Sequence, residues 1–162
     1  MKTNMITEHF SMAEMTHSST LDEYNKKFGT NYKNDPSPKE REALKHLCKQ
    51  LEDLRLLMGC PLKISSGFRS PLVNMLVGGS STSLHKYGLA ADVILPHDKM
   101  LEFAVRAMNM EFTWEVYLSY KTNSKQGSCW VHIGFETEKL DKCRVGVDIN
   151  GKVYACIHNK QL

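Results

Sequence analysis

The sequence predicts an α+β fold, in which helices dominate the first part of the chain and strands the last third. A long helical pattern spans Ser37 to Met58, whereas the residues after 114 form short alternating runs with a hairpin signal at Asn150-Gly151. Helices followed by strands favour an α+β domain. We therefore expect a compact domain with a central antiparallel sheet and flanking helices.

The longest predicted helix has clear signals at both ends. Ser37 is a good N-cap, Pro38 suits the first helical position, and Glu40 completes a capping box. Gly59 is a natural stop, and Pro61 prevents continuation. Apolar residues recur at steps of three and four and predict one buried stripe, made of Leu44, Leu47, Cys48, Leu51, Leu54 and either Leu57 or Met58.

Three further helices are predicted from shorter signals. Ser11 opens a short capped helix, a second helix runs over 70–76, and Asp98 caps a third over 99–110. The polar segment 18–35 is interpreted as an irregular surface loop that contains at most one helical turn. The predicted strands are 62–65, 91–95, 115–120, 129–135, 144–148 and 152–157, the last two joined by a type I′ turn.

The bulk properties describe an ordinary globular domain. The chain has 162 residues, which suits one domain over 1–162, with 1–36 as an irregular N-terminal segment packed on it. The formal charge is +3 and the basic residues are scattered, so nucleic-acid binding is not expected. The absence of a long apolar run excludes a membrane span. The sequence leaves the oligomeric state open.

Two features concern the compartment in which the chain is made. The N-terminus has no apolar core followed by a small-residue cleavage site, so we expect no signal peptide. Five cysteines, an odd number without close pairing, favour free thiols made in a reducing compartment.

The segment from Ser83 to Asp92 carries the main chemical signal. It places His85 and Asp92 seven residues apart around Gly88, before an apolar strand. A turn at Gly88 can bring the two side chains to a common point, and His132 offers a third ligand. Two imidazoles and a carboxylate, with a fourth position for water, make the ligand set of a catalytic zinc site. The alternatives are an ordinary core histidine, a turn-capping aspartate and an exposed strand histidine.

Several motifs occur together along nearly the whole chain. They are Ser65-Ser66-Gly67-Phe68-Arg69-Ser70-Pro71, Asn74, Gly78-Gly79, Ser83-x-His85-x-x-Gly88-x-Ala90-x-Asp92, Trp130-x-His132, His9-Phe10-Ser11-x-x-Glu14 and Gly151-Lys152-x-Tyr154. Together they resemble the M15 zinc peptidases, which include D-alanyl-D-alanine carboxypeptidases and phage L-alanyl-D-glutamate endolysins. The resemblance is closest to the short phage-associated branch.

The resemblance implies a fold, a metal and a substrate. The fold is the one shared with the Hedgehog signalling module, and the metal is zinc held by His85, Asp92 and His132. The substrate is a peptide bond of bacterial peptidoglycan, cleaved by a carboxypeptidase or an endolysin-like endopeptidase. The protein would be made in the cytoplasm without a signal peptide and act on the cell wall, either in a virion or as a free lytic enzyme.

Three further residues have both a functional and an ordinary interpretation. Arg69 would stabilise the oxyanion or bind a substrate carboxylate, or else form a surface salt bridge. Ser83 and Asn74 would contact substrate, or else serve as a turn serine and a helix-surface residue.

The general base is the unusual feature of this sequence. Family members commonly place an acidic residue three positions before the last histidine, where this chain has Cys129. Glu115 is a candidate base from the preceding strand, and Glu136 is a weaker one. Cys129 is interpreted as a small buried residue, since strand alternation directs it away from His132. The alternative is a thiolate that serves as a fourth zinc ligand, which would require a bulge. The alternative function is therefore a catalytically impaired zinc domain that serves as a virion structural or wall-binding module.

Overall fold

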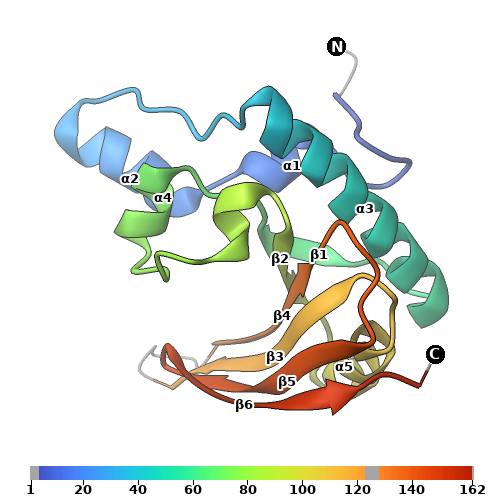
Figure 1. The fold of residues 1–162 in the computed structure, drawn as a ribbon. Coiled ribbons are helices and arrows are strands. Elements are labelled where there is room, and N and C mark those ends of the chain that lie inside the picture. The colour runs from blue at the N-terminus through green and yellow to red at the C-terminus, as the bar shows by residue number, and fades with distance from the viewer. Residues whose placement is uncertain (1–3, 123–127, 162) are drawn as a thin grey trace.

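A six-stranded sheet organises the described residues, 4–122 and 128–161, of the computed structural model (Figure 1). Its strand order is β1-β2-β4-β3-β5-β6. The strands are β1 (Lys63–Ser66), β2 (Ala90–Ile94), β3 (Thr113–Lys121), β4 (Ser128–Phe135), β5 (Lys142–Ile149) and β6 (Lys152–Asn159). The helices are α1 (Met12–Thr16), α2 (Ser19–Phe28), α3 (Pro38–Met58), α4 (Pro71–Leu76), the 3-10 helix η1 (Leu84–Tyr87) and α5 (His97–Met108). The predicted α+β class is confirmed.

The sheet is mixed rather than wholly antiparallel. β3 and β5 pair in parallel, while the other neighbouring strands are antiparallel. The reason lies in the connection 136–141, which carries the chain from β4 past the end of β3, so that β5 runs opposite to β4 on the far side of β3. Two backbone hydrogen bonds, from Glu136 to Phe112 and from Leu140 to Glu111, hold this connection.

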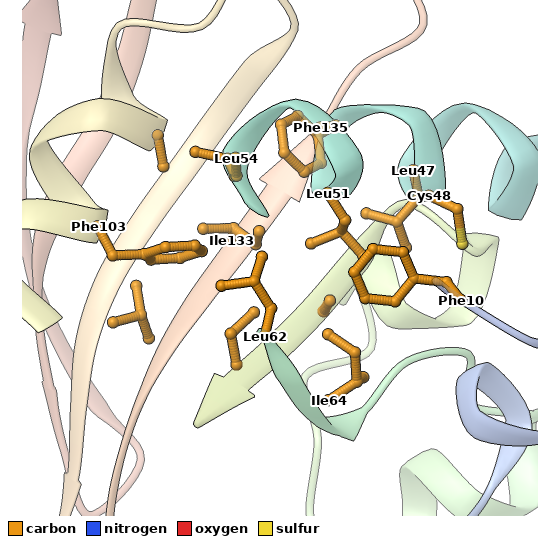
Figure 2. Packing of buried hydrophobic residues seen from close by; sticks show 14 of the residues in the cluster. Phe10, Leu47, Cys48, Leu51, Leu54, Leu62, Ile64, Phe103, Ile133 and Phe135 are labelled. Carbon is orange, nitrogen blue, oxygen red and sulfur yellow. The ribbon is translucent and has the colours of Figure 1, made fainter. Parts of the chain in front are cut away.

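The hydrophobic core lies between one face of the sheet and the helices α3 and α5. Leu51 and Leu54 of α3 and Phe103 of α5 pack with Ile133 of β4, as Figure 2 shows. Because side chains alternate along a strand, Val131 and Ile133 enter this core while Trp130 and His132 lie on the opposite face. The candidate site is therefore built on the face that α3 and α5 do not cover.

The end signals of α3 act as predicted. The backbone N–H of Ser37 donates to Glu40 Oε2 at 2.8 Å, and Gly59 ends the helix in the left-handed conformation. The predicted turn at Asn150-Gly151 also forms, with positive φ at both residues. In α5, however, the N-cap is Pro96, and Asp98 lies within the first turn instead of capping it.

The prediction of an irregular loop over 18–35 is wrong for its first half, which forms helix α2. The Ser18 side chain accepts a hydrogen bond from the Leu21 N–H, and Gly29 ends the helix with φ 64°. Leu21, Tyr24 and Phe28 follow a helical spacing, which the many polar residues between them obscure in the sequence. Among the described residues, no helix is both long and apolar enough to cross a membrane.

Candidate metal centre

Two neighbouring strands and a 3-10 turn supply the three candidate ligands. Asp92 on β2 and His132 on β4 are register partners, so their side chains lie on the same face of the sheet. His85 comes from η1, which ends at Gly88 with φ 71° and turns the chain into β2. A Cβ on Gly88 would lie 2.7 Å from the Glu40 carbonyl oxygen of α3, so glycine lets this turn pack against the helix.

The three ligand atoms converge on one point. His132 Nδ1 lies 2.9 Å from Asp92 Oδ1, and His85 Nε2 lies 3.3 Å from both of these atoms. The three atoms all lie within 4.8 Å of one another. The structure therefore brings together the three residues that the sequence predicts as metal ligands.

The hydrogen bonds on the outer side of each ring make this point suitable for a cation. His85 Nδ1 lies 2.6 Å from the Gly67 carbonyl oxygen, which can only accept, so Nε2 carries the lone pair. His132 Nε2 lies 2.9 Å from a Glu115 carboxylate oxygen, which in the same way leaves Nδ1 as an acceptor when the ring is neutral. Two nitrogen lone pairs and a carboxylate oxygen then face one another, and this donor set fits zinc.

Arg69 orients the Asp92 carboxylate. Its Nη2 donates to Asp92 Oδ2 at 2.7 Å, and its Nε donates to Ser66 Oγ at 2.9 Å. Both charged side chains are largely buried. The guanidinium thus occupies the outer carboxylate oxygen and leaves Oδ1 facing the two histidines. This is a buried ion pair rather than the surface salt bridge considered from sequence, and the oxyanion role of Arg69 stays a prediction.

Glu115 reaches the site through an irregularity in β3. Thr113 pairs with Phe135 and Glu115 pairs with Gly134, so Trp114 is an extra residue that forms a bulge. Thr113 consequently lies in the core, while Glu115 lies on the face of His132. The second Glu115 oxygen accepts a hydrogen bond from the Tyr117 hydroxyl at 3.1 Å.

The charges in this cluster stabilise one another. Burial alone would raise the pKa of Asp92, but His85 and His132 hold it well below its usual value. Burial also opposes the charged forms of His132 and Glu115. For His132, the hydrogen bonds and charges of Asp92 and Glu115 outweigh burial and raise its pKa to about 9. For Glu115, the hydrogen bond and charge of His132, with Tyr117 and Arg144, lower its pKa. Glu115 is therefore a carboxylate at neutral pH.

The family model described as Peptidase M15 matches residues 8–133, which include every candidate ligand as well as Arg69 and Glu115. The chain belongs to the peptidase M15 family. Members of this family are zinc-dependent peptidases, which agrees with the donor set of His85, Asp92 and His132. No curated protein matches the sequence. In this M15 domain, β5 and β6 lie beyond the matched segment.

The two predicted substrate contacts have clear structural positions. Ser83 precedes η1 as its N-cap, and its backbone accepts a hydrogen bond from Lys86. Asn74 is buried, and its Nδ2 donates to the carbonyl oxygens of Gly79 and Ser80. Asn74 is therefore not the helix-surface residue considered from sequence, and it fixes the loop before η1. Substrate binding by Ser83 and Asn74 stays a prediction.

Cys129 lies on the opposite face of the sheet from the ligands. It packs against the hydrophobic core, as strand alternation predicts, and is no fourth ligand. Glu136 follows β4, where its carbonyl oxygen interacts with His46 Nε2 at 2.9 Å. In the described structure the carboxylates within 4 Å of a ligand nitrogen are Asp92 and Glu115.

Sequence reasoning missed Tyr117 and Gly134 as parts of the M15 site. The Tyr117 ring stacks on the His132 ring with centroids 5.6 Å apart, and Gly134 leaves room for Glu115. The alternation of Glu115 and Tyr117 along one strand could have indicated a shared face with His132.

The raised pKa of His132 predicts a pH-dependent stability for the metal-free protein. The folded pKa of about 9 exceeds the ordinary 6.5, so this contribution is complete below pH 6.5 and is lost as pH rises towards 9. We expect the free energy of unfolding, measured by urea denaturation, to fall between these values. The fall should be smaller in His132→Gln. An equal fall in both proteins would show that His132 is not the source of this pH dependence.

Proposed function

We propose that the protein is a zinc-dependent peptidase that cleaves peptide bonds of bacterial peptidoglycan, as a carboxypeptidase or an endolysin-like endopeptidase. The observation that carries the proposal is the convergence of His85, Asp92 and His132 in a chain of the M15 family. The proposal includes delivery to the wall by a phage, with the peptidoglycan peptide as partner and no nucleic acid.

The residues of the site have separable roles in this proposal. Bound zinc would polarise the scissile carbonyl and lower the pKa of water towards 7. His85, Asp92 and His132 would hold the ion, and Arg69 keeps the Asp92 carboxylate turned towards it. Burial of these groups strengthens their electrostatic interactions, because water is largely excluded around them.

The test is peptide-bond cleavage in purified peptidoglycan by the zinc-loaded protein. We expect new amino termini to appear with wild type, to disappear in His132→Ala and to persist in His97→Ala, which changes an exposed histidine of α5. Mass spectrometry of the released fragments would identify the scissile bond. Equal release by wild type and His132→Ala, with zinc absent from the variant, would refute a metal-dependent reaction.

A second candidate function is a non-catalytic zinc domain that binds the wall or forms part of a virion. Cys129 occupies the sequence position at which family members commonly carry the base, and its side chain faces the core. This substitution favours the second candidate. It is favoured also by Glu115, both of whose oxygens are already engaged. Stoichiometric zinc binding without any release from peptidoglycan would support this candidate over the enzyme.

A further inference from the structure

We propose that Glu115 is a positioning residue that fixes the ring of His132 for metal binding, rather than the general base of the reaction. The inference rests on the zinc site of the proposed function. It concerns how this chain holds its third ligand, and it assigns to Glu115 a role different from the one that its acidity suggests in the sequence.

The first argument is the place of Glu115 around the His132 ring. Glu115 Oε1 lies 2.9 Å from Nε2, whereas Nδ1 is the atom that faces Asp92 and His85. The imidazole therefore stands between Glu115 and the point where the three ligands converge. A general base must reach the reacting proton directly or through one water. A carboxylate that accepts the outer N–H of a ligating histidine instead sets its tautomer and orientation.

The second argument is that the other groups around Glu115 and His132 fix this arrangement. The Tyr117 hydroxyl donates a hydrogen bond to Glu115 Oε2. The Tyr117 ring stacks on the His132 ring, with an angle of 9° between the two ring planes. Arg144 of β5 lies 4.0 Å from Glu115 Oε2, and its guanidinium is 5.9 Å from the centre of the Tyr117 ring. Both Glu115 oxygens thus have partners other than a substrate.

The third argument is that the backbone makes room for this contact. The bulge at Trp114 turns Glu115 to the site face, and Gly134 lies opposite it on β4. A Cβ on Gly134 would lie 2.7 Å from Glu115 Cγ and 2.7 Å from Leu84 Cδ1. The φ of Gly134 is not positive, so an alanine there would disturb these side chains without straining the backbone.

Two substitutions test the proposal through zinc affinity, measured by competition with a chelator in the absence of substrate. We expect Glu115→Gln to weaken zinc binding about 10- to 100-fold, as is typical for the loss of such an outer partner. Gly134→Ala keeps the carboxylate but displaces it, and we expect weakening in the same direction. Glu138→Gln, which changes an exposed glutamate, should bind zinc like wild type.

Two further readouts separate positioning from base catalysis and from a merely structural effect. At saturating zinc, we expect kcat of Glu115→Gln to fall by about tenfold, as for the loss of an outer partner of a ligand, whereas loss of a general base lowers kcat by roughly 10²–10⁴. The visible spectrum of the cobalt-substituted variant should shift, because the His132 ligand is reoriented. Unchanged zinc affinity in Glu115→Gln would overturn the proposal even if no peptidase activity were found.

Discussion

Replacement of Asp92 by asparagine should weaken zinc binding by several hundredfold and lower any metal-dependent peptidase activity at limiting zinc. Asparagine keeps the size of the side chain and can still accept a hydrogen bond from Arg69, but it removes the negative charge that faces both histidines. Zinc sites bind with about 10–16 kcal/mol in total, so one ligand is worth roughly 3–4 kcal/mol. That corresponds to a loss of affinity of several hundredfold.

The matched control for this substitution is Asp53→Asn, which changes an exposed aspartate of α3. Zinc affinity and peptide release should equal those of wild type in the control. Circular dichroism of the metal-free Asp92→Asn protein would establish that it still folds. Zinc binding of wild-type strength in folded Asp92→Asn would show that the metal, if bound, is held elsewhere in the chain.

Most elements of the fold and two of the three candidate ligands are predictable from sequence because their signals are local. The capping box of Ser37 and Glu40 defines the start of α3, and Gly59 defines its end. His85, Gly88 and Asp92 lie within one turn and the strand that follows it. Physical requirements that act over a few residues leave a readable pattern in one sequence.

The roles of Arg69 and Glu115 depend on contacts between distant segments and so could not be derived in the same way. Arg69 follows β1, but its partner Asp92 is 23 residues further along the chain. The position of Glu115 depends on the bulge at Trp114, which changes the face that each following residue of β3 occupies. The parallel pairing of β3 with β5 depends likewise on the path of the connection 136–141.

Substitution of Leu51 by alanine is expected to cause a large loss of stability. Leu51 is 0% exposed and packs among side chains from the helices and the sheet (Figure 2). Removing the three carbons Cγ, Cδ1 and Cδ2 from such a site leaves a cavity, which costs about 2–5 kcal/mol. Leu56→Ala on the same helix is the control, because Leu56 is 82% exposed and its loss should change stability by less than about 0.5 kcal/mol.

Urea denaturation with and without zinc connects this prediction to the metal centre. Zinc stabilises the folded state by an amount that depends on its concentration and affinity, whereas Leu51 lies in the core on the other face of the sheet. The loss caused by Leu51→Ala should therefore be the same for the metal-free and the zinc-loaded protein. The separation of the two faces predicts that the core and the metal centre act independently. A loss that zinc abolished would contradict this independence.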